Sequence, residues 1–134
     1  YDDAINAALN YTYQIIKSSI IRTLSVYGLI SYLGINHKSK VNNFNLVYDL
    51  IEPYRAIADL YVYNLQERLS YPLPFTIRKE LINILNIPVM SNGKKCTLEY
   101  SIDNLVRSYV KYLANKEGEL SFPRLIEWGR IESD

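Results

Sequence analysis

The sequence predicts a mostly α-helical fold with one small β-hairpin, formed by a single domain over residues 1–134. Apolar residues recur at three- and four-residue steps over long stretches, and glycine and proline are scarce, at five each. One Asn-Gly pair, Asn92-Gly93, lies between two short apolar runs and is typical of a tight turn. Hydrophobic residues make up 49% of the chain, which indicates a globular domain rather than a disordered segment.

The first helix is expected from about Ala4 to Tyr27. Asp2 or Asp3 is suited to the N-cap, because a side-chain oxygen there accepts from a free backbone N–H. Gly28 is suited to the left-handed position that follows a helix end. The apolar stripe of this helix comprises Ile5, Leu9, Ile16, Ile20 and Leu24.

The second helix is expected from Leu46 to Leu69, with Pro53 inside it. Its buried stripe comprises Leu46, Leu50, Ile51, Tyr54 and Ile57. Proline removes a backbone donor and crowds the preceding turn, at a cost of about 3 kcal/mol in a helix interior, so we expect a kink. Such departures often lie near functional sites, and the alternative is a helix that merely bends around the core.

Three further helices are expected, at Phe75–Asn86, Ser101–Asn115 and Phe122–Ile131. Ser101 would cap the second of them, and Trp128 would pack inward from the last. Between the first two, the Asn-Gly pair predicts a hairpin within residues 87–100, with Lys94 and Lys95 near its tip.

Composition excludes several classes of protein. The net charge of +1 does not indicate a strong non-specific nucleic-acid binder, so any DNA contact must come from local basic clusters. Cys96 is the only cysteine, which excludes an internal disulfide framework and a cysteine-rich zinc site and favours an intracellular protein. The apolar run over residues 15–33 contains Lys17, Arg22 and several serines, so we interpret it as a core helix and a turn rather than a membrane span.

The residues that could bind a metal ion or take part in catalysis lie mainly between Gly34 and Arg55. His37 is the only histidine, and Asp49, Glu52 and Arg55 would share one helix face because they are three residues apart. Two carboxylates one turn apart, joined by an imidazole from a loop, could hold Mg²⁺ or Mn²⁺. Spacing alone favours a plainer alternative, in which Glu52 pairs with Arg55 on the surface and His37 has no chemical role.

Tyrosine is abundant, with thirteen copies. Four of them could rim a groove and stack on or hydrogen-bond to nucleic acid: Tyr11, Tyr13, Tyr48 and Tyr54. For most of them we prefer the commoner role of tyrosine, which is packing at the edge of the core with the hydroxyl near water.

Three motifs in a fixed order resemble the CRISPR-associated Cas-one family, the integrase of spacer acquisition. They are NAALNYTY (6–13), GLISYLGINH (28–37) and NFNLVYDLIEPYR (43–55). Weaker support comes from the segment around Asn92-Gly93 and from VRSYVKYL (106–113). The resemblance covers nearly the whole chain and implies a small N-terminal β domain followed by a helical catalytic domain. This chain is expected to be the greater part of that helical domain alone.

The resemblance also implies a metal site made of a glutamate, a histidine and a second acid. The histidine matches His37 and the second acid matches Glu52, so these two would hold Mg²⁺ or Mn²⁺. Asp49 matches an auxiliary acid that orients the site or binds the metal through water. The first glutamate of the family lies upstream of the NAALNY motif, so this chain is expected to lack it and to be inactive alone.

The implied reaction is a direct transesterification, in which a 3′-hydroxyl end of spacer DNA attacks a phosphodiester of the repeat. Five cations are candidates to neutralise phosphates, with ordinary surface charge as the alternative: Arg55, Lys38, Lys40, Arg22 and Lys17. The implied partners are double-stranded DNA, a second copy in a homodimer and the small Cas-two protein. The implied location is the cytoplasm of a prokaryote.

Two other functions stay open at this stage. A non-catalytic helical module could bind DNA or act as a scaffold, and its DNA affinity would survive mutation of His37 and Glu52. A helical protein-interaction domain would show no DNA affinity, or an affinity that does not depend on salt.

Overall fold

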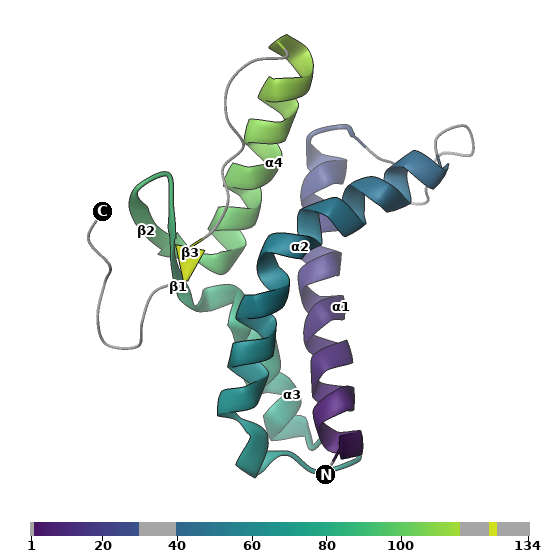
Figure 1. Cartoon of the computed structure of the whole chain (residues 1–134), viewed down its shortest axis with the longest axis vertical. Coiled ribbons are helices and arrows are strands. Elements are labelled where there is room, and N and C mark those ends of the chain that lie inside the picture. Colours follow the sequence, from purple (N-terminus) through teal and green to yellow (C-terminus); the bar gives the residue numbers. More distant parts are fainter. Residues whose placement is uncertain (1, 30–39, 116–123, 126–134) are drawn as a thin grey trace.

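Two long helices, α1 (Asp2–Val26) and α2 (Lys40–Asn64), form the frame of the molecule and run antiparallel to each other (Figure 1). The computed structural model describes residues 2–29, 40–115 and 124–125. The mostly helical prediction is confirmed, and within this part of the chain no helix is both long and apolar enough to span a membrane.

The end of α1 is a Schellman motif, as the glycine in the sequence predicts. The N–H of Leu29 donates to the carbonyl of Leu24 at 2.9 Å, and the N–H of Gly28 donates to the carbonyl of Ser25 at 3.0 Å. Gly28 has φ +77°, a conformation that a residue with a Cβ adopts only with strain. These bonds satisfy carbonyls that the helix itself leaves unpaired.

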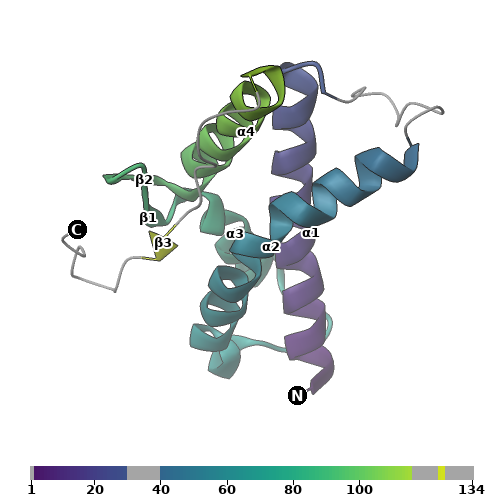
Figure 2. The same ribbon diagram turned by 45° about the horizontal axis from the view of Figure 1, so that its top comes forward.

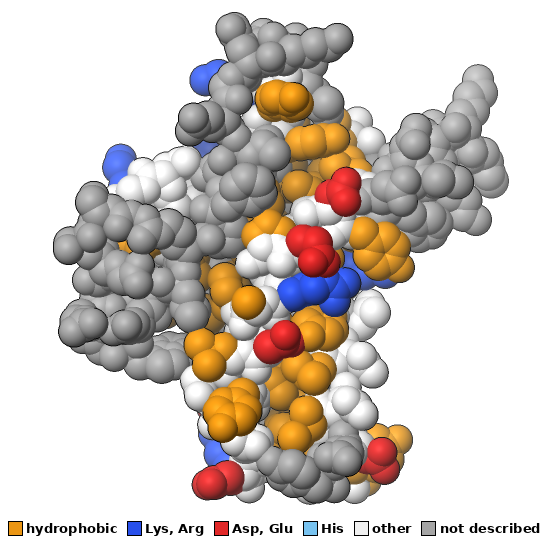
Figure 3. All heavy atoms as spheres, viewed as in Figure 1, with side chains coloured by type: hydrophobic (Ala, Val, Ile, Leu, Met, Phe, Trp, Pro, Cys, Tyr) orange, Lys and Arg blue, Asp and Glu red, His pale blue; other side chains and the backbone are white. Residues whose placement is uncertain are grey.

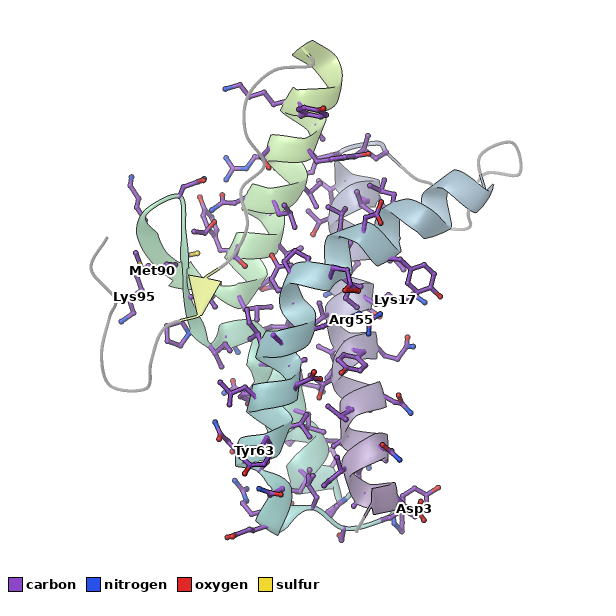
Figure 4. The ribbon with its side chains drawn as sticks, in the orientation of Figure 1. Asp3, Lys17, Arg55, Tyr63, Met90 and Lys95 are labelled. Carbon is purple, nitrogen blue, oxygen red and sulfur yellow. The ribbon has the colours of Figure 1, made fainter. Side chains whose placement is uncertain are left out.

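The second helix begins earlier than the apolar pattern predicts and ends at Asn64, where a short 3₁₀ turn, η2 (Gln66–Arg68), follows. Pro53 lies inside it, as expected. Figure 1 shows α2 changing direction along its length, and Figure 4 places the bend beside the labelled Arg55. The proline supplies the cause, because its ring and its missing N–H open the preceding turn.

Helix α3 (Phe75–Ile82) continues into a 3₁₀ turn, η3 (Asn83–Asn86), so together they match the third predicted helix. Helix α4 (Leu98–Asn115) then packs against α1 and lies above α3 in the view of Figure 2. The predicted cap of this helix is wrong. Thr97 caps it instead, because its Oγ1 accepts from the N–H of Tyr100 at 3.1 Å, whereas Ser101 is buried inside the first turns and donates to the carbonyl of Leu98 at 2.6 Å.

The predicted hairpin is confirmed as β1 (Pro88–Ser91) and β2 (Lys94–Thr97), paired antiparallel. Asn92 at φ 55° and Gly93 at φ 74° have the positive dihedrals of a type I′ turn. A short strand, β3 (Arg124–Leu125), pairs with the other edge of β1, giving the order β2-β1-β3.

Strand β3 corrects the prediction of a last helix over Phe122–Ile131. Arg124–Leu125 pair with Val89 and Met90, because the free edge of β1 offers backbone groups that only an extended segment can pair with. Tertiary pairing therefore outweighs the local pattern at these two residues. The other residues of the expected helix, including Trp128, lie outside the described part.

The core lies where α1, α2, α3 and α4 meet. Most residues of the two predicted stripes are buried there, whereas Ile5, Leu9 and Leu46 are half-buried at its edge. The largest fully buried side chains are Tyr54, Ile16, Ile20, Leu24, Leu81, Ile84, Leu98, Ile102 and Leu105.

Candidate metal and nucleic-acid site

The structure describes part of the predicted site. His37 and Lys38 lie outside the described residues, and Lys40 begins α2 with a side chain that is not described. The expected meeting of His37 with Glu52 therefore stays a prediction. The remaining candidates lie on α1 and α2 and are described below.

Asp49 and Glu52 are both exposed on α2, one helical turn apart. The side chain of Glu52 is 66% exposed, and its Oε2 accepts from Nε of Arg55 at 2.6 Å. The surface pair favoured by spacing alone is thus present. It leaves the other oxygen of Glu52 and the whole carboxylate of Asp49 accessible to a further ligand.

Arg55 also reaches across to α1, where its guanidinium lies 5.3 Å from the centroid of the Tyr13 ring. The hydroxyl of Tyr13 in turn donates to a carboxylate oxygen of Asp59. Partial burial, together with this bond and the nearby negative charge of Asp59, raises the pKa of Tyr13 to about 12. The phenol therefore stays protonated at neutral pH and remains a donor.

Lys17 also lies on α1 at the contact with α2, and its Nζ is 5.5 Å from the centroid of the exposed Tyr48 ring. We call this contact surface, with Tyr13 and Lys17 on α1 and Tyr48 and Arg55 on α2, the seam. Figure 4 shows Lys17 and Arg55 near each other, on facing sides of the two helices. The structure thus brings these two predicted phosphate contacts together beside Glu52. Arg22 does not join them, because it lines a hollow with Ser18 and Ile82 on the side of α1 that faces α3.

The face that carries this seam has mixed charge. Figure 3 shows acidic side chains in a row along α2, with basic groups between them. Asp49, Glu52 and Asp59 contribute three carboxylates, whereas Arg55 and Lys17 contribute two cations. Among the side chains that the structure describes on this face, carboxylates outnumber cations, which favours binding of a divalent cation.

The donors fit Mg²⁺ or Mn²⁺ in chemical type, because both ions prefer oxygen ligands such as carboxylates. Asp49 and Glu52 supply carboxylates from one helix face. Within the described part of the chain, no group of three or more His, Cys, Asp or Glu residues is arranged to hold a metal. A complete site therefore needs a further donor, and His37 is the one that the sequence predicts.

One prediction about the site, the position of Tyr54, is wrong, and one contact, between Tyr13 and Asp59, was not predicted from the sequence. Tyr54 does not rim a groove: it is fully buried, and its hydroxyl lies 3.1 Å from Oγ of Ser101 on α4. The bond between Tyr13 and Asp59 joins residues 46 positions apart. No periodicity within one helix signals such a contact, because it depends on how α1 and α2 pack.

Comparison with known proteins points to one family. The sequence profile described as "CRISPR associated protein Cas1" matches residues 1–86, more than half of the chain. The CRISPR-associated endonuclease Cas1 of Neisseria meningitidis serogroup C (strain 8013) is 37% identical over 128 residues, which cover 93% of this chain and 42% of that protein. The CRISPR-associated endonuclease Cas1 1 of Francisella tularensis subsp. novicida (strain U112) is 30% identical over 131 residues, which cover 92% of this chain and 40% of that protein.

A third relative matches over a shorter stretch. The CRISPR-associated endonuclease Cas1 2 of Saccharolobus solfataricus is 42% identical over 57 residues, which cover 42% of this chain and 19% of that protein. The chain thus spans about 40% of the length of the Neisseria and Francisella relatives. The profile match over residues 1–86 includes all eight residues that the sequence analysis selects for the site.

Proposed function

Because this chain belongs to the Cas1 family of CRISPR-associated proteins, we propose that it is the helical part of a metal-dependent DNA endonuclease and integrase of CRISPR adaptation. The complete protein joins the 3′-hydroxyl ends of spacer DNA to the repeat by transesterification. One observation carries the proposal: the family match spans the histidine and both carboxylates of the predicted site. The Neisseria and Francisella relatives are both named as endonucleases.

In this proposal His37 and Glu52 bind Mg²⁺ or Mn²⁺, and Asp49 orients the site from the adjacent turn of α2. A bound divalent ion polarises a phosphodiester and stabilises the negative charge that develops on its oxygens. The exposure of Glu52 and Asp49 supports these roles, since a ligand can reach both carboxylates without a change in the core.

Arg55 and Lys17 supply positive charge next to Glu52 and contact DNA phosphates, together with Lys38 and Lys40. Arg22 faces α3 and is not part of this group. Arg55 has two alternative anionic partners, the Glu52 carboxylate and a phosphate. When a cation neutralises Glu52, the Arg55 guanidinium becomes available to the phosphate. One phosphodiester is exchanged for another in the reaction, so no nucleotide energy source is required.

The partners in this proposal are double-stranded DNA, a second copy of the protein in a homodimer and the small Cas-two protein, in the cytoplasm of a prokaryote. Family membership supports them.

Mn²⁺ binding to the 134-residue chain, followed by electron paramagnetic resonance, tests the metal site directly. We expect Glu52→Gln and His37→Ala each to weaken Mn²⁺ binding by at least about tenfold, because each removes a direct ligand. Glu99→Gln, which removes an exposed carboxylate from the first turn of α4, is the matched control and leaves binding unchanged. Equal affinities for all three variants and the unaltered chain would contradict the proposed ligands.

The second candidate is a non-catalytic helical module that binds DNA or acts as a scaffold. The Glu52–Arg55 pair favours it, because a salt bridge on the helix surface needs no metal. This candidate predicts no specific Mn²⁺ binding and a DNA affinity that Glu52→Gln leaves intact.

A further inference from the structure

A concave surface lies where α1 faces α3. It consists of two adjoining hollows, of about 620 and 300 Å³, which share Tyr11 and Gln14. We call them together the α1 groove. Helix α1 forms one wall with Asn10, Gln14, Ser18 and Arg22, which recur every four residues and therefore form one stripe. The opposite wall comprises Tyr71, Pro72, Leu73, Arg78, Ile82 and Leu85.

The described charges of the α1 groove are of one sign. Of the lining side chains that the structure describes, none is an Asp or Glu, and both charged ones are arginines, Arg22 and Arg78. Among the described residues neither arginine forms a salt bridge with a carboxylate. The side-chain amides of Asn10 and Gln14 add neutral donors. Such a lining is complementary to phosphate and needs no metal ion to neutralise carboxylates first.

Exposed aromatic rings stand at one end of the groove. Tyr71 is 69% exposed and lines it, and Phe75 is 65% exposed at the start of α3. The guanidinium of Arg78 and the ammonium of Lys79 lie 5.8 and 5.6 Å from the Phe75 ring centroid. Large rings this exposed are available for stacking, and the two cations concentrate positive charge around them.

We propose that the α1 groove binds a single strand of DNA. Proteins bind single strands by combining a positively charged groove, which follows the backbone, with aromatic rings on which unpaired bases stack. Arg22 and Arg78 would contact phosphates from opposite walls, and the Tyr71 ring would stack on a base. A base within a duplex has no free face to offer, so the exposed rings favour a single strand. The choice of DNA rests on the function proposed above, whereas the groove itself is independent of the metal site.

Fluorescence anisotropy of a labelled oligothymidine of about 12 nucleotides, with the full chain and EDTA present, tests this proposal. We expect Arg22→Gln and Arg78→Gln each to reduce the slope of log affinity against log salt by about 0.7, the loss of one phosphate contact on a single strand. Gln14→Glu places a negative charge in the groove at an exposed helical position and should weaken binding without affecting folding.

The aromatic contribution is tested separately. Tyr71→Ala should weaken binding by about fivefold or more, and Tyr71→Phe should stay within about twofold because it keeps the ring. Arg68→Gln is the charge control, since Arg68 is also exposed but already pairs with Glu80 at 3.1 Å.

Three results would overturn the proposal: no measurable binding of the oligothymidine at low salt, losses in the groove variants no larger than in Arg68→Gln, or tighter binding of a duplex of the same length. Because EDTA removes divalent ions, oligothymidine binding is measured here without any contribution from the proposed metal site. A failed Mn²⁺ titration together with intact oligothymidine binding would therefore contradict only the metal site, and the reverse outcome would contradict only the groove.

Discussion

Nε of Arg55 lies 2.6 Å from Oε2 of Glu52, one helical turn earlier on α2, at the seam where α2 meets α1. The carboxylate that we propose as a metal ligand thus already has a cation beside it. The same guanidinium stacks over the Tyr13 ring, 5.3 Å from its centroid. Arg55 is therefore held where it would compete with the proposed metal ion for Glu52.

Replacing Arg55 tests this competition. We expect Arg55→Gln to increase the affinity of the chain for Mn²⁺ by a few-fold, because the carboxylate of Glu52 loses its competing cation. The free energy of unfolding should fall by no more than about 1 kcal/mol, since an exposed ion pair contributes little. Mn²⁺ titration and urea denaturation measure the two effects. Arg107→Gln, which breaks a similar exposed pair with Asp103 on α4, should not change Mn²⁺ affinity.

The buried hydroxyl of Tyr54 gives a second prediction. Ser101 donates to the carbonyl of Leu98, so the Tyr54 hydroxyl is the donor in the bond to Ser101. Tyr54→Phe removes that donor and leaves Ser101 paired, so the free energy of unfolding should fall by about 1 kcal/mol. Urea denaturation measures the change. Tyr63→Phe is the control, because the Tyr63 side chain is 63% exposed, and a comparable loss there would contradict the role of the buried bond.

The Tyr13 hydroxyl predicts a change of stability at high pH. Its pKa is about 12 in the folded chain, against an ordinary value of 10.0. The folded state therefore holds the proton more tightly, and the stability that this provides is complete below pH 10 and is lost as the pH rises from 10 to 12. Tyr13→Phe should make stability fall less steeply across this window in denaturation experiments at several pH values.

Asp59 gives an independent check on the same group. Asp59→Asn removes the negative charge that opposes ionisation of Tyr13, so the pKa of Tyr13 should fall but remain above its ordinary value, because burial is the larger cause. Ultraviolet titration of tyrosinate, compared with Tyr13→Phe to assign the signal, measures it. An unchanged Tyr13 titration in Asp59→Asn would contradict the bond between the two residues.

The turn that ends α1 gives a fourth prediction. Gly28 has φ +77° and no atom within 4 Å of the place where a Cβ would stand, so Gly28→Ala meets backbone strain rather than a clash. We expect a loss of about 1 kcal/mol in the free energy of unfolding, and a smaller loss for Gly28→Asn, because asparagine tolerates the left-handed region better. Thermal denaturation compares the two variants, and equal losses would contradict the explanation.

The sequence predicts the main elements because their signals are local. The Asn92-Gly93 pair determines the hairpin turn through two positive φ angles, and Gly28 marks the end of α1 in the same way. The kink that Pro53 predicts is present in α2. For the site, the spacing of Glu52 and Arg55 predicts the surface pair that the structure shows.

Two other features could not be predicted from the sequence, because they depend on tertiary contacts. Ser101 looks like a helix cap in the sequence, yet it is buried against Tyr54 because Thr97 begins the helix earlier. Arg124–Leu125 become a strand only because β1 has a free edge. In each case the deciding contact joins segments that are distant in the chain, which local propensity cannot register.

By itself, the sequence determined the helical class, the turns and the family, because these depend on local spacing and on ordered motifs. Only the tertiary structure decided that Arg55 and Lys17 share the seam beside Glu52 while Arg22 lines the separate α1 groove. All three cations look equivalent in the sequence. Their difference arises from which neighbour each face of α1 packs against, since side chains a few residues apart on a helix point in different directions.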